Sequence, residues 1–466
     1  MAQFDVVVIG GGIVGAGTAA LAAQAGLRVA LLERGDFACG TSSASSKLIH
    51  GGLRYLRMGD VGLVREALRE SRILRRRVAP HLVHDLRFVL PVYEGARYGR
   101  PAIGAAMAAY GALALRRPAF ATPARATELV PQLRTDGLRG AGLFWDAQTD
   151  DARLVLANVR AAADAGAFVA NRCEVVGVER GVVHTSDGLE LRTTHVVNAT
   201  GPAVDAVRRL EAPAAGTSVT LSKGVHLVVD LPDGWQAALA TPIDASRIAF
   251  AIPWQGVLLL GTTDTPAEHA TITEDDEAQV LAEASAALPV ELLGRDAVRA
   301  RFAGLRVLPV TGSSTAEARR EVTLTVGPLG MLTVAGGKLT TYRVIARAVL
   351  RRLGYRLPAS AVPLPGAAEP AQVAAELDVD APLALHLART YGSLAHEVLA
   401  TSDDLTPLAD GAPEIAAQVV YAREREWAVD ADDVLRRRTT LALRGLASPD
   451  VRARVAQLLT AQATTA

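Results

Sequence analysis

The stretch DVVVIGGGIVGAG, residues 5–17, decides how the first part of this chain folds. DVVVIG is a short β-branched run, which is typical of a strand buried on both faces. The alanine-rich segment 13–26 favours a helix, and Gly26 is suited to its C-terminal cap. RVALLE, residues 28–33, predicts a second buried strand. Residues 5–33 therefore predict a right-handed, parallel βαβ unit.

Three glycines of this stretch, Gly10, Gly12 and Gly15, form the pattern G-x-G-x-x-G between the strand and the helix. Gly10 permits a tight turn, Gly12 lets a pyrophosphate approach the backbone, and Gly15 lets the helix pack closely on the strand. Phosphates then lie at the positive end of the helix. Glu33, at the end of the second strand, can accept hydrogen bonds from ribose hydroxyls. The pattern predicts a dinucleotide site but does not by itself separate NAD from FAD.

The following segment, GTSSASSKLIHGGLRYL at 40–56, shows no hydrophobic period. A nicotinamide enzyme normally continues its alternating strands and helices here, so the break favours FAD. The short hydroxyl side chains can wrap a second phosphate or the edge of an isoalloxazine ring. Lys47, His50 and Arg54 follow without a polar spacer, which is unlike a solvated turn.

The composition bounds the class of protein. Lys plus Arg equals Asp plus Glu at 49 each, so no global field favours a nucleic-acid partner. Cys39 and Cys173 are too few for a disulfide framework or a zinc site, and we expect no metal. Together with the lack of a signal peptide, this favours a cytoplasmic location. The 466 residues leave room for two or three domains.

Later segments predict a second, antiparallel sheet and a helical tail. RIAFAIPW (247–254) and VLLLGTTDT (257–265) flank Gln255-Gly256 and predict a hairpin. RLPASAVPLPGAAEP, residues 356–370, is rich in Pro and Ala and predicts a linker. The chain beyond it has helical patterns, and its basic run DVLRRRT (433–439) is expected on a solvated face, with a partner surface as the alternative.

Residues 102–115 hold no charge and are flanked by arginines on both sides. A spanning helix needs about 20 apolar residues, so this segment is too short to cross a bilayer. Two interpretations stay open. The segment is a buried core helix, or it lies in a membrane interface with the arginines on anionic head groups.

Several motifs follow one another in an order that resembles the FAD-dependent glycerol-3-phosphate dehydrogenase family. They are VVIGGGIVGAG, GTSSASSKLIHGGLRYL, DDARLVLANV, VVNATGP, GTTDT and GGKLTTYR. The resemblance extends over nearly the whole chain, because REREWAVDADDVLRRRTTLAL (423–443) is similar to the C-terminal domain of that family. SSKLIHGGLRYL and GGKLTTYR are far more specific than the dinucleotide pattern, which many flavoproteins share.

The resemblance implies an α/β, D-amino-acid-oxidase-like flavoprotein with a Rossmann-like FAD-binding domain, an antiparallel-sheet substrate domain and a helical C-terminal domain. The expected boundaries are 1–80, 140–220 and 300–355 for FAD, 81–139 and 221–299 for the substrate and membrane-facing domain, 356–371 for the linker and 372–466 for the helical domain. It further implies noncovalent FAD, oxidation of sn-glycerol 3-phosphate to dihydroxyacetone phosphate, and electron transfer to quinone. Similar bacterial proteins are homodimers that rest peripherally on the cytoplasmic face of the membrane without a spanning helix.

Oxidising a secondary alcohol needs a hydride acceptor, a base and, here, an anchor for phosphate. We expect His226 as the base, with His50 as the second choice, and arginine forks as the anchor. The expected catalytic residues are His226, Lys338 and Arg306, and the expected substrate contacts are Arg54, Tyr55, Thr262, Thr263, Arg306 and Arg320. The expected cofactor contacts are Gly10, Gly12, Gly15, Glu33, Thr41, Ser42, Ser43, Ser46, Lys47, Leu48, His50, Ala199, Thr200, Gly201, Gly337, Lys338, Leu339 and Thr340.

The chain departs from the family pattern in the expected phosphate site. Val307 follows the arginine of AGLRVLP where the family usually has proline, and RRE with Glu321 replaces the usual SRD, which makes Arg319 a further possible anchor. These changes bear on the substrate and leave FAD binding untouched. The alternatives are an oxidase that uses O₂, a related FAD-dependent oxidoreductase with another substrate, or a flavin-binding protein without turnover.

Overall fold

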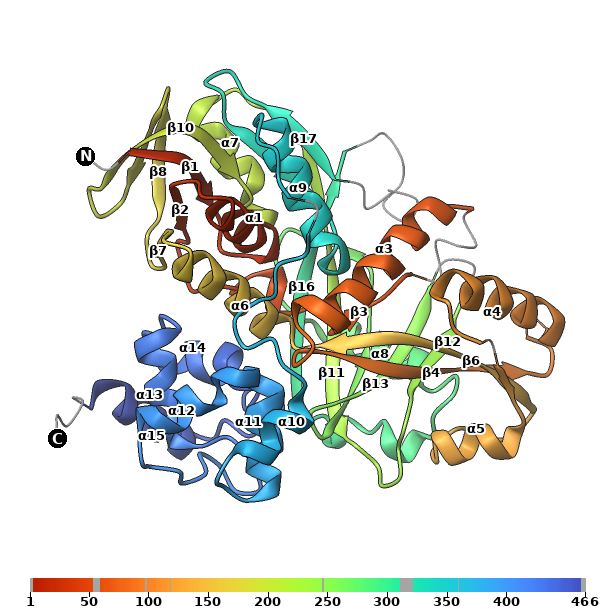
Figure 1. The fold of residues 1–466 in the computed structure, drawn as a ribbon. Helices are drawn as coiled ribbons and strands as arrows, with labels where there is room; N and C mark the ends of the chain where they lie inside the picture. Colours follow the sequence, from red (N-terminus) through yellow and green to blue (C-terminus); the bar gives the residue numbers. More distant parts are fainter. Residues whose placement is uncertain are drawn as a thin grey trace.

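The computed structural model describes residues 3–52, 59–96, 99–117, 119–244, 247–310, 322–358 and 360–461. Within them the chain forms two sheets and a C-terminal group of helices (Figure 1). This arrangement confirms the fold class expected from the sequence.

The first sheet is built on the βαβ unit predicted at the N-terminus. Strand β1 (Gln3–Ile9) pairs in parallel with β2 (Val29–Leu32) and with β10 (Glu190–Asn198), and α1 (Ile13–Gln24) connects β1 to β2. The order is β17-β18-β10-β1-β2-β7, with β9 paired to β10 and β8 paired to β9. The remaining bounds are β7 Phe168–Ala170, β8 Val175–Glu179, β9 Val182–Thr185, β17 Thr323–Val326 and β18 Leu332–Ala335.

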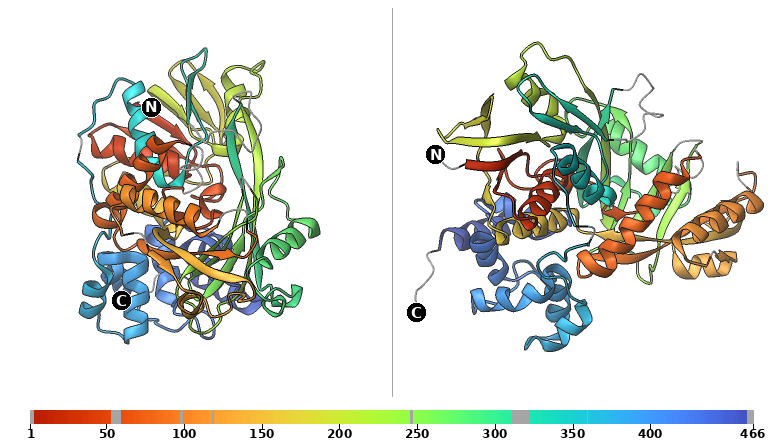
Figure 2. Two further views of the ribbon diagram at one scale, coloured as in Figure 1. Left: turned by 90° about the vertical axis from the view of Figure 1, so that its right-hand side faces the viewer. Right: turned by 45° about the horizontal axis from the view of Figure 1, so that its top comes forward.

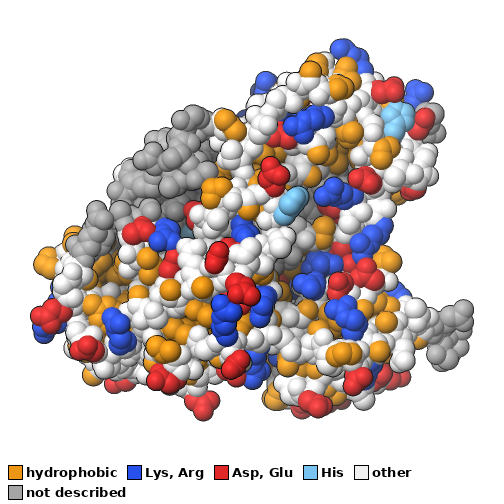
Figure 3. Space-filling model, turned by 180° about the vertical axis from the view of Figure 1, so that it is seen from behind, with side chains coloured by type: hydrophobic (Ala, Val, Ile, Leu, Met, Phe, Trp, Pro, Cys, Tyr) orange, Lys and Arg blue, Asp and Glu red, His pale blue; other side chains and the backbone are white. Residues whose placement is uncertain are grey.

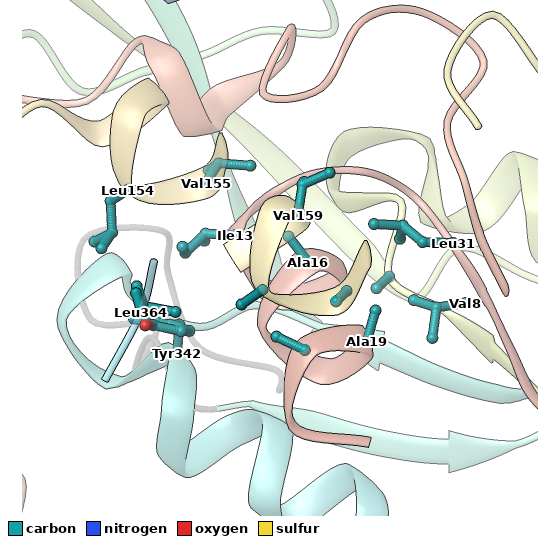
Figure 4. Packing of buried hydrophobic residues seen from close by; sticks show 14 of the residues in the cluster. Val8, Ile13, Ala16, Ala19, Leu31, Leu154, Val155, Val159, Tyr342 and Leu364 are labelled. Atoms are coloured by element: carbon teal, nitrogen blue, oxygen red, sulfur yellow. The ribbon is translucent and has the colours of Figure 1, made fainter. Parts of the chain in front are cut away.

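Helices α1, α6 (Asp151–Asp164) and α9 (Tyr342–Arg352) pack on one face of this sheet. Figure 4 shows Val8 and Leu31 facing Ala16, Ala19 and Val159. The alternate residues Val7 and Ile9 face the other side, where they pack against Val175 and Val183. Burial on both faces is the reason that these strands read as continuous apolar runs.

The second sheet is mainly antiparallel. Its order is β15-β11-β14-β13-β12-β4-β6-β3, with β16 paired to β11 and β5 paired to β6. The predicted hairpin is confirmed as β13 and β14, and both turn residues, Gln255 and Gly256, have positive φ. The bounds are β3 Leu48–Ile49, β4 Val83–Tyr93, β5 Ala119–Ala121, β6 Leu138–Thr149, β11 Val219–Asp230, β12 Ala238–Pro242, β13 Ile248–Trp254, β14 Val257–Gly261, β15 Thr265–Pro266 and β16 Ala300–Pro309.

The sheet membership of three strands differs from the expected domain boundaries. Strands β3, β6 and β16 belong to the second sheet, although residues 1–80, 140–220 and 300–355 were expected with the FAD-binding part. Strand β16 pairs with β11 along ten residue pairs, so pairing with a distant strand fixes its position. We propose the same division of the chain into domains, with these three strands assigned to the second sheet.

Several helices cover the second sheet. Asp60 caps α3 (Val61–Ile73), as the sequence suggests, by accepting a hydrogen bond from Leu63 N. Helix α4 (Arg100–Ala114) buries Ile103, Met107 and Tyr110 and turns its alanines outward. Helices α5 (Pro123–Leu129) and α8 (Glu274–Ala284) also pack on this sheet, whereas α7 (Val204–Glu211) packs on the first sheet, beside β8 and β18.

The C-terminal helices form a separate core. It contains α10 (Pro370–Glu376), α11 (Ala381–Tyr391), α12 (Ala395–Thr401), α13 (Ala416–Arg425), α14 (Ala431–Asp433) and α15 (Pro449–Thr460). These helices lie at the opposite end of the molecule from α4 in Figure 1 and in the right-hand view of Figure 2. Their basic run does not form the solvated face that was expected, because Arg437 and Arg438 are buried.

The described surface shows charges of both signs. On the face seen in Figure 3, Lys and Arg side chains lie among Asp and Glu side chains. This face therefore presents no broad field of one sign. Among the helices that the structure describes, none is both long enough and apolar enough to span a bilayer.

Candidate active site

A cavity of about 680 Å³ lies where the two sheets meet. Its wall includes the N-terminal end of α1, the loop before β3, the end of β10, strands β11 and β16 of the second sheet, and the turn before α9. A volume of several hundred cubic ångströms is typical of sites for cofactors and small ligands. The cavity therefore brings together segments that are up to about 300 residues apart in the sequence.

The glycine turn forms one end of this cavity. Gly10 has φ +109°, and a Cβ there would lie 2.7 Å from the carbonyl oxygen of Ala199. A Cβ on Gly15 would lie 1.9 Å from the oxygen of Gly10, so this glycine allows the helix to pack on the strand. Gly10 and Gly12 line the cavity, whereas Gly15 lies behind its wall. The backbone therefore leaves open space at the positive end of α1.

Glu33 lines the same end, and its carboxylate is held by the backbone. Gly11 N donates to Oε2 at 2.7 Å and Gly35 N donates to Oε1 at 2.8 Å. These bonds fix the carboxylate beside the glycine turn, where an acceptor for ribose hydroxyls is expected.

The interpretation of Lys47 as a cofactor contact is not supported by its position. Lys47 is absent from the cavity wall and fully buried, and its Nζ donates to Asp151 Oδ1 and to Ser43 O, both at 2.6 Å. Asp151 also accepts from Ser45 N and Oγ at 3.0 and 2.6 Å. Burial explains why Lys47 forms an ion pair instead of contacting the cofactor. A buried ammonium group needs an anionic partner, and Asp151 of α6 supplies one.

His226 lies on β11 and lines the cavity. Its ring stacks on Phe302 of β16 with centroids 4.8 Å apart, and its Nε2 lies 2.9 Å from Ser46 Oγ. Its Nδ1 is buried and has no hydrogen-bond partner. Burial, with Arg306 and Lys47 nearby, lowers the pKa of His226 to about 3. The ring is therefore neutral at pH 7.

Arg306 reaches the cavity from β16, on the same face of the sheet as His226. Its Nη2 donates to Thr262 Oγ1 at 3.0 Å and its Nη1 donates to Thr263 O at 2.9 Å. Asp264 lies 3.4 Å from Nη1. These contacts hold the guanidinium at the wall, where it can meet an anionic group.

Two glycines separate His226 from Arg306 on the paired strands. Gly224 of β11 lies opposite Gly304 of β16 in the register, and both line the cavity. A Cβ on Gly224 would lie 2.4 Å from Arg306 Nη2, and one on Gly304 would lie 2.7 Å from Ala44 O. The two glycines therefore let the Arg306 guanidinium and Ala44 lie close against the sheet beside His226.

The loop at residues 48–52 and the turn at 336–340 close the cavity together. His50 N donates to Thr340 Oγ1 at 3.1 Å, across 290 residues of sequence. Lys338 belongs to the same turn and lines the cavity. The two motifs that carry the family resemblance thus meet at one site.

The predicted site residues fall into three groups. Some line the cavity, some do not, and some lie outside the residues that the structure describes. Ser43, like Gly15 and Lys47, is not part of the cavity wall, and Arg54, Tyr55 and Arg320 lie outside the described residues. The predicted residues that line the cavity are Gly10, Gly12, Glu33, Thr41, Ser42, Ser46, Leu48, His50, Ala199, Thr200, Gly201, His226, Thr262, Thr263, Arg306, Gly337, Lys338, Leu339 and Thr340.

Four acidic residues of the wall, Asp146, Asp151, Glu174 and Asp264, were not among the predicted site residues. Asp151 anchors the hydroxyl-rich loop, and its position in DDARLVLANV was an available signal. Asp146 accepts from Tyr110 OH at 2.8 Å and from Gly51 N at 3.1 Å, and burial raises its pKa to about 7. No sequence signal pointed to Asp146, because its partner Tyr110 comes from a distant helix. No group of three or more potential metal ligands occurs among the described residues.

Comparison with known proteins assigns the chain to a family. Residues 5–343 match the family of FAD dependent oxidoreductases, and residues 358–464 match the C-terminal domain of alpha-glycerophosphate oxidase. The chain is 36% identical to glycerol-3-phosphate dehydrogenase 2 of Mycobacterium tuberculosis, with 95% of this chain and 81% of that protein covered. This chain belongs to the FAD-dependent glycerol-3-phosphate dehydrogenase family. The dehydrogenase of Synechocystis is 35% identical, with 94% of this chain and 89% of that protein covered.

Solved structures agree with membership of this dehydrogenase family. The glycerol-3-phosphate dehydrogenase of Bacillus halodurans, complexed with FAD, has a TM-score of 0.74 and 28% identity, with 99% of this chain and 96% of that chain covered. L-alpha-glycerophosphate oxidase of Mycoplasma pneumoniae has a TM-score of 0.62 and 20% identity, with 78% of this chain and 100% of that chain covered, which shows a shared fold.

FAD is the cofactor of this dehydrogenase family member, and the described residues fit it. The glycine turn leaves space for phosphates at the end of α1, Glu33 supplies a ribose acceptor, and Ser42 lies beside the turn, where its Oγ accepts from Ile13 N at 3.0 Å. At the other end, His226, Arg306 and Lys338 line the same cavity.

Proposed function

We propose that this protein oxidises sn-glycerol 3-phosphate to dihydroxyacetone phosphate and passes the electrons through FAD to quinone. The observation that carries the proposal is the placement of His226 and Arg306 on one face of β11 and β16, across two facing glycines. A base and a cation on one face of the sheet, four residues apart along β16, suit a substrate that carries a hydroxyl group and a phosphate.

When bound, FAD supplies the acceptor for the hydride that leaves the middle carbon. His226 takes the hydroxyl proton at Nε2, because Nδ1 is buried, whereas Nε2 lies 2.9 Å from Oγ of Ser46, a residue of the cavity wall. Ser46 orients the imidazole ring, and stacking on Phe302 keeps that orientation. Arg306, held by Thr262 and Thr263, binds the phosphate. Lys338 supplies a cation that favours the negative charge of the reduced flavin.

Substrate bleaching of the yellow flavin tests this function. Under anaerobic conditions, we expect glycerol 3-phosphate to reduce the flavin at concentrations about 100-fold below those needed for glycerol, because a charge-assisted phosphate contact is worth about 1.5–3 kcal/mol. Arg306→Gln should remove most of that preference. Arg247→Gln is the matched control, since Arg247 is another arginine of the cavity wall with acidic partners, Asp244 and Glu283, but lies outside strands β11 and β16. Bleaching by amino acids instead of glycerol 3-phosphate would reject the proposal.

Oxygen is the second candidate for the electron acceptor. The match of residues 358–464 to the C-terminal domain of alpha-glycerophosphate oxidase favours it. Measuring O₂ consumption and quinone reduction by the same reduced protein distinguishes the two, and rapid O₂ consumption without quinone reduction would favour the oxidase.

We also propose that the protein acts as a homodimer on the cytoplasmic face of the membrane, with α4 toward the lipid. Three side chains of α4 are buried, so one side of the helix belongs to the core. The other side exposes alanines, and Leu115 at its end is 75% exposed. Arg116 pairs with Asp85 at 2.6 Å, which leaves Arg117 as the exposed arginine at this end. An apolar face with a flanking cation suits shallow binding at a membrane interface.

Leu115→Glu tests the membrane contact without opening the core. We expect about tenfold weaker binding to anionic liposomes, because one buried leucine contributes about 1.5–3 kcal/mol. Val429→Glu is the control, since Val429 is 60% exposed in the C-terminal helices. Cosedimentation with liposomes measures the effect, and equal binding of the two variants would exclude α4 as the contact.

A further inference from the structure

A short loop after β2, residues 34–40, lies between the glycine turn and the C-terminal helices. We call it the nucleotide loop. On one side it touches the turn directly, because Ala38 N donates to Gly11 O at 3.0 Å. Arg34, Cys39 and Gly40 of this loop line the cavity. The position of the loop therefore shapes the end of the cavity that receives the nucleotide half of FAD.

On its other side the C-terminal helices hold the nucleotide loop. Asp36 is 1% exposed, and its Oδ1 accepts from Arg438 Nη2 at 2.8 Å. Its Oδ2 accepts from Arg437 Nε and from Arg438 Nη1. The ring of Phe37 packs edge-on against Trp427 with centroids 5.7 Å apart. A buried carboxylate and a buried ring thus connect the loop to the C-terminal helices.

The two arginines are themselves fixed. Arg438 is fully buried, and its Nε donates to the carbonyl oxygen of Glu426 at 3.2 Å. Arg437 Nη2 donates to Asp433 Oδ1 at 2.7 Å, and Arg172 Nη2 donates to the same carboxylate oxygen at 2.8 Å. A paired, buried network of this kind has little freedom to rearrange. The C-terminal helices therefore present preformed cations to Asp36.

We infer that the C-terminal helices set the affinity for FAD, and that Arg438 is a positioning residue for the cofactor through Asp36. When Arg438 is removed, the carboxylate loses two of its donors in a buried site, and the loop must shift to rehydrate it. A shift of the loop moves Ala38 away from Gly11 and widens the phosphate turn. The cost appears in FAD binding, although Arg438 does not line the cavity.

A purely structural role is the alternative, in which the network only stabilises the fold. Arg444 provides the matched control, because it is also a buried arginine in an ion pair, with its Nη1 2.7 Å from Glu414 Oε1. Both partners of this pair belong to the C-terminal helices, and neither contacts the nucleotide loop. If both ion pairs only stabilise the fold, substituting Arg438 or Arg444 should change the Kd for FAD to the same extent.

The experiment compares Arg438→Gln with Arg444→Gln in the full chain. FAD is titrated into the apoprotein, its Kd is measured from quenching of flavin fluorescence, and Tm is recorded for each variant. We expect both variants to lower Tm by similar amounts, Arg438→Gln to raise Kd at least tenfold, and Arg444→Gln to leave Kd within twofold. Arg438→Lys, which keeps a cation near Asp36, should restore part of the affinity.

Equal changes in Kd for the two variants, or an unchanged Kd in Arg438→Gln, would overturn the inference. If Arg438→Gln does not fold, Arg437→Gln decides, because its side chain is 9% exposed and Arg438 stays on Asp36. A Kd raised at least threefold by Arg437→Gln supports the inference, and an unchanged Kd contradicts it. These readouts do not depend on which substrate the protein oxidises.

Discussion

His226→Ala is expected to lower kcat by about 10²–10⁴-fold, the usual contribution of a positioned general base. The flavin content and the fold should be retained, because alanine removes the imidazole without introducing an unpaired charge. Steady-state turnover with a dye acceptor measures kcat, and flavin absorbance measures FAD content. The ring is neutral at pH 7, since burial first and neighbouring cations second lower its pKa to about 3.

His81→Ala is the control for this variant. His81 is also a buried histidine, and burial lowers its pKa to about 3, but it does not line the cavity. It should leave kcat within a few-fold of the wild type while changing stability. Wild-type turnover in His226→Ala would remove His226 as the base and leave His50 as the next candidate on the cavity wall.

Lys47→Met is expected to lower the free energy of unfolding by about 3–5 kcal/mol, because it leaves a buried carboxylate without its cation. Lys47 and Asp151 are both 0% exposed, and their atoms Nζ and Oδ1 are 2.6 Å apart. The substitution should also weaken FAD binding at least tenfold. Asp151 of α6 holds the hydroxyl-rich loop through both Lys47 and Ser45, and only the contact with Ser45 would remain. Denaturant unfolding and FAD titration measure the two effects.

Lys223→Met separates the two effects. Lys223 also forms a buried ion pair, with its Nζ 2.5 Å from Asp276 Oδ2. Unlike the loop that Lys47 belongs to, Lys223 does not line the cavity. We expect a similar loss of stability with FAD affinity unchanged. If Lys47→Met kept wild-type FAD affinity, the loop would not depend on this ion pair.

Much of the fold was predictable because its signals are local. The strand, glycine turn and helix at 5–33 lie within one contiguous segment, and the structure confirms β1, α1 and β2 there. The turn at Gln255-Gly256 and the cap at Asp60 also depend on neighbouring residues only. The start of helix α13 at Ala416 depends instead on a more distant contact, because Pro407 and Ile415 form a bridge that holds the preceding chain extended.

The site was predictable as a set of residues but not as an arrangement. The family motifs pointed to His226, Arg306, His50 and Lys338, and all four line the cavity. Lys47 lies in the same motif as His50, yet it turns toward Asp151. Within a motif, the direction of each side chain depends on partners that the motif does not contain.

The sequence by itself determined the dinucleotide turn, the two sheets, the helical tail and the family, because residue spacing and short-range conformational preference encode them. Tertiary structure decided that β16 joins β11, that His226 and Arg306 share one face, and that Arg437 and Arg438 are buried on Asp36. The physical reason is that a buried charge or an edge strand must find a partner, and the partner lies far away in the chain.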